Sequence, residues 1–414
     1  MPMPTQLVVR YRVVTPAFLG GADLYRAELR PPSIKAALRF WYRAVDPAFA
    51  RRDGRGPVRE SLLFGATEHG SGQSKVLLSL AGQDVKSMSS SVIKWDQFAE
   101  GNGRRVKNGL AYLGYPLRPR RDAPDDEIRT ALAPGSTFSI RLVVRPGGND
   151  LQDHELRGLV AAAWLMGHLG GLGSRSRRGF GSLAVEDWRA EGPEADAFTN
   201  VMKKLPLGST LKDPEAWAHA WSRAVAELRS WFGGFPTDAK QRLANPNLGP
   251  LMRTNVVKTA FTGGEWPRAM NAAGRLLQDF RALRQPDYDL VKEHLLQVAR
   301  APGGKFLQAA PPRVTFGLPL TFRFGSLTTR PTDLTLVPYP DSSREPGQFE
   351  ERMGSLLFVR ILTLRDGLHP AFFRLDGAVP GIDTLAGQRF SGGRPLGRPA
   401  SNALDDFMSS LERT

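Results

Sequence analysis

The chain has 414 residues, of which 41% are hydrophobic and 23% are charged, so it can build more than one hydrophobic core and is not disordered throughout. It carries 56 Lys and Arg residues against 41 Asp and Glu residues, and the net charge of +15 favours a polyanionic partner, above all nucleic acid. Cysteine is absent, which excludes disulfide scaffolds, cysteine-ligated zinc and thiol nucleophiles.

The N-terminal residues 1–14 lack the basic segment and apolar core that mark a secretory signal peptide. No apolar run approaches the roughly 18 residues of a membrane-spanning helix. The longest run, 159–169, contains Gly167 and His168 and predicts a buried helix. We therefore expect a soluble, cytoplasmic protein that makes no contact with a membrane.

The first predicted element is a strand over 7–14, in which apolar residues alternate with Arg10 and Arg12. A helix is predicted from Ser33, a residue type that favours the N-cap position, to Val45. Apolar residues recur along it at helical spacing and predict a buried stripe. The stripe consists of Ile34, Leu38, Trp41 and Val45.

A second face of this predicted helix carries Lys35, Arg39 and Arg43 at spacings of four residues, with Tyr42 beside them. Like charges at this spacing repel each other on an isolated helix. A solvated charged face is the ordinary explanation for such a pattern. The absence of intervening acidic residues and the adjacent tyrosine favour a polyanion as the partner of this face.

Further elements complete the N-terminal half in the order strand, strand, helix, strand. They are expected at 75–80, 136–145, 156–169 and 183–188, with a mobile segment at 85–91. The whole order is typical of a ferredoxin-like α+β unit with insertions.

The remainder of the chain predicts a helical region followed by a second mixed α+β unit. Helices are expected at 266–283 and 402–413, and strands at 314–324 and 356–364. The predicted organisation is therefore an N-terminal domain, a helical insertion or linker, and a C-terminal domain. These cover 1–190, 191–250 and 251–414.

The sharpest motif, GLGSRSRRGFG, follows directly after the second predicted helix and covers 171–181. Its glycines are Gly171, Gly173, Gly179 and Gly181, and its arginines are Arg175, Arg177 and Arg178. Glycine permits positive φ and close approach of another chain segment, and backbone amides in such loops bind anions. We expect the glycines to support a tight turn and the arginines to contact phosphate. The spacing matches neither the Walker motif nor the dinucleotide-binding motif.

A third group of basic residues, Arg104, Arg105 and Lys107, precedes an aromatic segment. The six histidines form neither an HxxxH nor an HExxH pattern, so the sequence predicts neither a metal site nor a cofactor. A nucleophile elbow of the GxSxG type is also absent from the sequence.

Taken together, these segments resemble the RAMP superfamily of CRISPR-associated proteins. The loop 171–181 matches the signature loop of the superfamily. Other stretches are similar to one branch, the first subunit of the Cmr (type III-B) effector complex. These are 15–22, 29–43, 63–65, 72–78 and 109–114, and weaker, degenerate motifs lie at 316–319 and 352–357.

The resemblance implies two ferredoxin-like (RAMP or RRM-like) domains with helical insertions. It also implies CRISPR guide RNA, target RNA and other Cmr RAMP subunits as partners in antiviral defence. Some members of the superfamily are endoribonucleases that use His, Tyr or Lys near this loop or the first helix. Here neither segment contains a histidine, and we therefore expect a non-catalytic RNA-binding subunit.

The expected RNA contacts are Lys35, Arg39, Tyr42, Arg43, Arg104, Arg105, Lys107, Arg175, Arg177 and Arg178. Because both helices of a ferredoxin-like unit pack on one sheet face, we expect the loop arginines and the basic face of the first helix to form one surface. Two alternatives stay open. One is a metal-independent endoribonuclease, with Tyr42, Lys35 and His69 as the only candidate acid–base groups. The other is a scaffold subunit that contacts only proteins.

Overall fold

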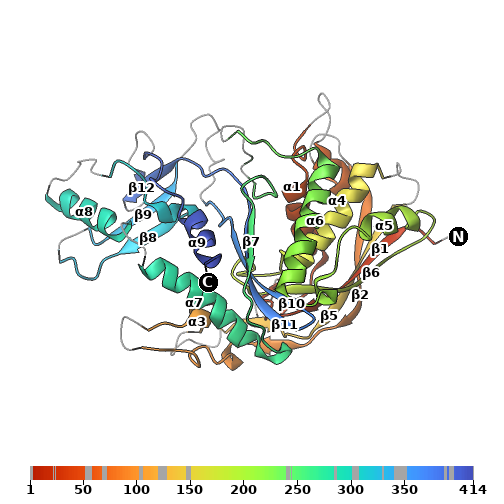
Figure 1. The fold of residues 1–414 in the computed structure, drawn as a ribbon, viewed down its shortest axis with the longest axis horizontal. Helices are drawn as coiled ribbons and strands as arrows, with labels where there is room; N and C mark the ends of the chain where they lie inside the picture. The colour runs from red at the N-terminus through yellow and green to blue at the C-terminus, as the bar shows by residue number, and fades with distance from the viewer. Residues whose placement is uncertain are drawn as a thin grey trace.

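Two α+β halves make up the structure, a computed structural model, with the N-terminal half at one end of the long axis and much of the C-terminal half at the other (Figure 1). The structure describes residues 3–21, 23, 25–51, 58–67, 72–101, 106–119, 128–145, 151–238, 243, 245–283, 287–300, 307–328, 331–339, 352–386, 389–390 and 396–413. Within these ranges no helix is both long enough and apolar enough to cross a membrane.

The N-terminal half is built on an antiparallel sheet of four strands. The strands are β1 (Gln6–Val13), β2 (Val76–Asp84), β5 (Thr137–Val144) and β6 (Leu183–Glu191), in the order β2-β5-β1-β6. Helices α1 (Pro31–Val45) and α4 (Asp153–His168) pack together over this sheet (Figure 1). The first strand lies inside the sheet, beside the third and the fourth strands. This arrangement is ferredoxin-like and confirms the predicted fold class.

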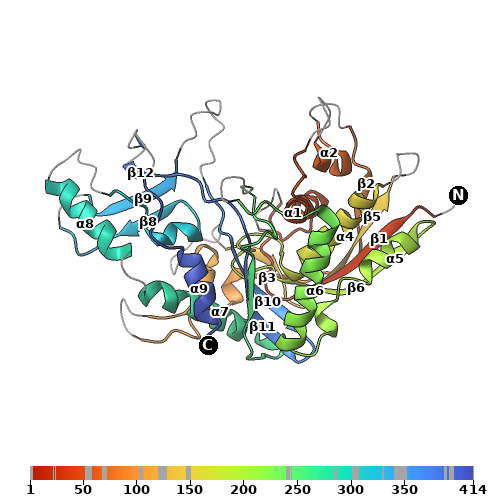
Figure 2. The same ribbon diagram turned by 45° about the horizontal axis from the view of Figure 1, so that its top comes forward.

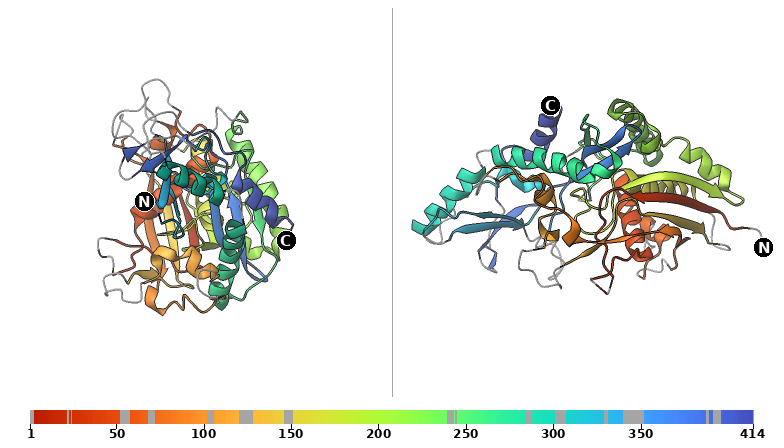
Figure 3. Two further views of the ribbon diagram at one scale, coloured as in Figure 1. Left: turned by 90° about the vertical axis from the view of Figure 1, so that its left-hand side faces the viewer. Right: turned by 90° about the horizontal axis from the view of Figure 1, so that it is seen from below.

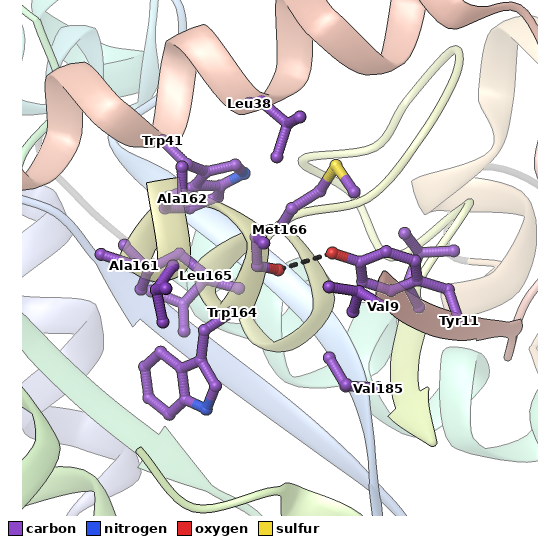
Figure 4. Packing of buried hydrophobic residues seen from close by; sticks show 14 of the residues in the cluster. Val9, Tyr11, Leu38, Trp41, Ala161, Ala162, Trp164, Leu165, Met166 and Val185 are labelled. Carbon is purple, nitrogen blue, oxygen red and sulfur yellow. Dashed lines mark hydrogen bonds between the residues drawn. The ribbon is translucent and has the colours of Figure 1, made fainter. Parts of the chain in front are cut away.

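Strand β1 alternates as its sequence predicts. Val9 and Tyr11 have no exposed surface, whereas Arg10 is exposed. The Tyr11 hydroxyl donates a hydrogen bond of 2.8 Å to the carbonyl oxygen of Ala163 in α4, which links the sheet to the helix. Figure 4 shows this contact and, across α4, the side chains that α1 contributes to the same core.

Helix α1 begins earlier than predicted, and Ser33 is not its N-cap. The N-cap residue is Arg30, whose side chain makes no capping bond, and Pro31 and Pro32 occupy the first helical positions. Proline fits there because the first amides of a helix have no intrahelical acceptor and its φ is already helical. The buried stripe Ile34, Leu38, Trp41 and Val45 is as expected.

The C-terminal half contains a three-stranded sheet in the order β10-β11-β7. Its strands are β7 (Arg253–Val256), β10 (Leu357–Leu364) and β11 (Gly367–Arg374), and its helices are α7 (Trp266–Leu283) and α9 (Ala403–Leu411). The order β7, α7, β10, β11, α9 reproduces the first five elements of a ferredoxin-like unit. Among the described residues no fourth strand joins this sheet, which fits a degenerate second domain.

A second sheet is inserted in this half and lies with helix α8 at the far end of the molecule (Figure 2). It contains β8 (Leu320–Arg323), β9 (Asp333–Pro338), β12 (Ile382–Ala386) and β13 (Arg389–Phe390), and α8 covers Asp287–Arg300. The predicted strand 314–324 is therefore wrong in its first part. A 3₁₀ turn, η7 (Pro312–Phe316), precedes β8, because Gly317 has a φ of +123° and Pro319 has no amide hydrogen.

The region predicted as a helical insertion or linker packs against both halves. It contains α5 (Ala195–Met202) and α6 (Pro214–Phe232). Trp221 of α6 stacks on Trp164 of α4 at 5.4 Å between ring centroids and meets Phe373 of β11 edge-on at 5.6 Å. Helix α6 therefore shares in the core that joins the N-terminal sheet to the β10–β11 hairpin.

Several short elements complete the described structure. They are α2 (Arg59–Phe64), β3 (Ser87–Ser89), η1 (Ser90–Val92), α3 (Gly109–Leu113), η3 (Tyr115–Leu117) and β4 (Thr130–Leu132). Residues 85–91, expected to be mobile, contain β3 paired with β4 instead. Helix α3 packs on α7, and the view from below in Figure 3 shows α7 running from the junction between the halves toward α8.

Candidate nucleic-acid interface

The glycine-rich loop 171–181 lies where the two halves meet. The amide of Gly181 donates a hydrogen bond of 2.9 Å to the carbonyl oxygen of Pro16, in the segment after β1. From the other half, the amide of Val359 in β10 donates to the carbonyl oxygen of Arg177 at 3.1 Å. The loop is therefore held by backbone bonds to both domains.

The loop glycines adopt conformations that other residues avoid. Gly173, Gly179 and Gly181 have φ values of +86°, +89° and +63°. A Cβ atom at Gly181 would collide with the carbonyl oxygen of Leu172, and one at Gly173 with that of Phe18. The predicted tight turn is confirmed, because no side chain fits in these close approaches.

A cavity of about 530 Å³ opens beside the loop, and we call it the arginine pocket. Its lining residues are Arg175, Ser176, Arg177, Arg178, Arg281, Phe316, Gly317, Leu318, Pro319, Leu320, Met353 and Ser355. The described lining thus brings four guanidinium groups together and includes no carboxylate. Such a site attracts an anion, because only an anion offsets the mutual repulsion of these charges.

Arg175 and Arg281 each reach one wall of the pocket from a different element. Arg175 has a positive φ of +62°, and its Nε donates to the carbonyl oxygen of Leu113 at 2.9 Å. Arg281 of α7 donates from Nη1 to the Tyr112 hydroxyl at 2.7 Å. Helix α3 therefore orients both guanidinium groups.

Arg177 packs against aromatic rings. Its guanidinium carbon lies 5.2 Å from the ring centroid of Phe40 in α1 and 4.9 Å from that of Phe358 in β10. Its Nη1 donates to the carbonyl oxygen of Ser355 at 2.9 Å. These contacts fix the side chain between the two halves and are attractive because a cation favours the face of an aromatic ring.

Arg178 is the least compensated cation of the pocket. Its Nη1 is buried and has no hydrogen-bond partner among the described residues. Burial lowers the pKa of Arg178 to about 10, and the nearby Arg281, Arg175 and Arg177 add to the effect while Tyr112 opposes it. The group stays protonated at pH 7 and has an unsatisfied buried donor, so its positive charge favours an anion in the neighbouring pocket.

The basic face of α1 was expected to have no acidic partner, but the structure provides one. Arg39 and Arg43 both bind the carboxylate of Glu60 in α2, with Nε–O distances of 2.5 and 2.7 Å, and the Glu60 side chain is only 5% exposed. Helix α1 has no acidic residue on this face, and Glu60 of α2 takes that place. Partial burial, followed by the charges of Arg39 and Arg145, lowers the pKa of Lys35.

Tyr42 does not lie on the basic face, and the expectation that its ring stands beside the arginines at the surface is wrong. It has no exposed surface, and its hydroxyl donates to Asp46 at 2.7 Å. Burial and then Asp46 raise the pKa of Tyr42. The half-buried aromatic residue that α1 presents toward the loop is Phe40, which the sequence analysis did not single out.

The predicted single surface is therefore only partly present. Helix α1 meets the loop through Phe40 and Arg177, while Arg39 and Arg43 are engaged with α2. Lys107 pairs with Asp279 of α7 at 2.5 Å and keeps 44% of its side chain exposed. Arg104, Arg105 and His69 lie outside the described residues.

Replacing both α1 arginines, as in Arg39→Ala/Arg43→Ala, should lower the free energy of unfolding by about 3 kcal/mol or more, because it strands the buried Glu60 carboxylate without a partner. Denaturant titration would measure this loss. Adding Glu60→Leu to the double variant should recover much of it, since no unpaired buried charge remains. Equal stabilities for the wild type and the double variant would contradict the ion pair.

The buried histidines have structural partners. The ring of His168 contacts the carbonyl oxygen of Trp164 at 2.8 Å through Nδ1 and accepts from the amide of Gly208 at 3.0 Å through Nε2. Burial lowers its pKa to about 4, so it is neutral at pH 7. Within the described ranges, no three His, Asp or Glu side chains are arranged to hold a metal ion.

The sequence model of the RAMP superfamily matches residues 10–184. This part of the chain is a RAMP domain. The match runs from β1 through α4 to the start of β6 and so includes the glycine-rich loop. The resemblance drawn from the sequence motifs is confirmed.

One protein is similar to this chain in sequence and another is similar in fold. The sequence is 26% identical to the CRISPR system Cmr subunit Cmr1-2 of Pyrococcus furiosus over 190 residues, which cover 42% of this chain and 91% of that protein. The fold is similar to that of Cmr1 from Pyrococcus furiosus in its apo form, with a TM-score of 0.53, 16% identity and coverage of 98% and 96% of the two chains.

A chain of the type III-B Cmr-beta complex, bound to cognate target RNA and AMPPnP, is also similar in fold. Its TM-score is 0.50 at 12% identity, and the match covers 100% of this chain and 99% of that chain. The shared fold therefore extends from the RAMP domain across the C-terminal half, as expected for a protein with two such domains.

Proposed function

We propose that this protein is a non-catalytic, RNA-binding subunit of a type III-B CRISPR Cmr effector complex. The observation that carries the proposal is the arginine pocket, which sets four guanidinium groups beside the signature loop of the RAMP domain. The names of the relatives support the assignment to a Cmr complex. Its partners would be guide RNA, target RNA and other Cmr subunits in antiviral defence in the cytoplasm.

The proposed RNA contacts are the pocket arginines Arg175, Arg177, Arg178 and Arg281. Four other basic residues keep part of their surface exposed and are proposed as additional RNA contacts outside the pocket. They are Lys35, Arg39, Arg43 and Lys107. Phosphate contacts of this kind are blind to sequence and release counterions from the nucleic acid. A subunit that holds RNA of any sequence needs this type of contact.

The absence of catalysis is also a proposal. Of the candidate acid–base groups within the described residues, Tyr42 is buried and bonded to Asp46. Neither Tyr42 nor Lys35 lines the arginine pocket. A general base must reach the 2′-hydroxyl of the RNA, and a tyrosine inside the core cannot do so.

Titration of the pure chain with single-stranded RNA at several salt concentrations tests the proposal. Binding should show little sequence preference and weaken with salt by roughly 0.7 in log–log slope for each neutralised phosphate. An affinity that is absent at low salt would favour the scaffold alternative. Reproducible cleavage of a labelled guide precursor, abolished by Tyr42→Phe in a folded variant, would establish the endoribonuclease instead.

A further inference from the structure

A second, smaller cavity of about 200 Å³ adjoins the arginine pocket at Arg177 and is lined by residues of α1, the loop and β10. We call it the aromatic slot. Its walls include Phe40, Trp41, Phe358, Gly171, Ser176 and Arg177. Ser176 and Arg177 line both cavities, so the two share a wall.

The dimensions and walls of the aromatic slot suit a single planar ring. Its volume is below the roughly 300–1,000 Å³ of pockets that enclose drug-sized ligands. The Phe40, Trp41 and Phe358 rings pack on one another, with centroids 5.9 Å apart for Phe40 and Phe358 and 5.6 Å apart for Trp41 and Phe358. They form one aromatic wall, and a planar occupant would lie against this wall and not between its rings. Gly171 contributes only backbone atoms to the lining, and a Cβ there would collide with Nη1 of the buried Arg360.

The shared wall restricts the chemistry of an occupant. A molecule that fills both cavities must place an anionic group among the pocket arginines and an apolar, planar group against the rings, with Arg177 between them. A nucleotide has this composition. Arginine guanidinium planes and aromatic side chains are the usual stacking partners of unpaired RNA bases.

We propose that the aromatic slot receives one nucleobase of a single-stranded RNA whose adjoining phosphate lies in the arginine pocket, with Phe40 as the stacking residue. The inference rests on the proposed RNA-binding function and adds to it the position of a base. Because every base has a stacking face, the slot contributes affinity without a strong sequence preference.

The test uses the full chain and a short single-stranded RNA that carries 2-aminopurine at one position at a time. One position should lose fluorescence on binding, as expected for a base stacked in the slot. Phe40→Leu, which keeps the bulk of the residue, should abolish this loss and weaken binding about tenfold, in line with the stacking energy of one base. Phe40→Trp should retain both. Tyr288→Leu, at a half-exposed tyrosine in the remote α8, is the matched control and should behave as the wild type.

An abasic site at the same RNA position separates stacking from a merely structural role. Wild type and Phe40→Leu should bind this RNA equally, with the same salt dependence. If Phe40→Leu weakens binding of intact and abasic RNA alike, or changes the salt slope, the ring only positions Arg177 and the slot is overturned. An unchanged affinity of Phe40→Leu for intact RNA overturns it as well. If the wild type binds no RNA, the proposed function itself fails.

Discussion

The variant Arg178→Met/Arg281→Met should bind single-stranded RNA about a hundredfold more weakly than the wild type while unfolding at the same or a higher temperature. Each arginine offers charge-assisted hydrogen bonds to phosphate, and losing one such contact costs about 1.5–3 kcal/mol. The salt dependence should become shallower by up to about one unit for each lost phosphate contact.

Stability should not fall with affinity, because the pocket charges repel one another and Nη1 of Arg178 lacks a partner in the described structure. The variant loses the hydrogen bond of Arg281 to Tyr112, which is worth about 1 kcal/mol. Replacing the poorly compensated charge of Arg178 with an apolar side chain of similar length is expected to offset this loss. The opposite responses of binding and stability would mark the arginine pocket as a binding site held at a cost to the fold.

The matched control removes two positive charges elsewhere on the protein. Arg268 and Arg189 are 64% and 55% exposed and pair with Glu265 and Glu191 on the surface. Arg189→Met/Arg268→Met should leave the affinity nearly unchanged. An equal loss in both double variants, measured by titration at several salt concentrations, would mean that net charge and not the pocket governs binding.

The second large effect concerns stability. Gly181→Ala should lower the free energy of unfolding by about 3 kcal/mol or more, because it adds the cost of a left-handed conformation to a collision with the carbonyl oxygen of Leu172. Gly181 also holds the loop to Pro16, so displacement of the chain there would disturb the arginine pocket.

Gly72→Ala isolates the conformational part of this effect. Gly72 has a φ of +65°, against +63° for Gly181, and a Cβ there would have nothing within 4 Å. Gly72→Ala should therefore lower the free energy of unfolding by only about 1 kcal/mol. Chemical denaturation of both variants provides the comparison. If Gly181→Ala is no less stable than Gly72→Ala, the close approach of the loop to its own carbonyl oxygen is not a constraint.

Sheet and helix patterns were readable in the sequence because they depend on neighbours a few residues apart. The alternation in β1 and the apolar stripe of α1 lie where predicted, and α7 has the predicted bounds 266–283. The glycine motif likewise reports a local backbone requirement. The split of 314–324 into a turn and β8 was missed, although Gly317 and Pro319 carried the signal.

What the sequence determined by itself was therefore the α+β class, the order of the ferredoxin-like elements, the tight loop and the excess of positive charge. Only the tertiary structure decided which of those charges are compensated. Glu60 reaches Arg39 and Arg43 from α2. Arg281 lies with Arg178 in the lining of the arginine pocket, although the two residues are far apart in the sequence. Tyr42 turns into the core while Phe40 turns toward the loop, because the packing of α1 against α4 and β10 selects the buried face. Such contacts depend on segments distant in sequence, and no local pattern records them.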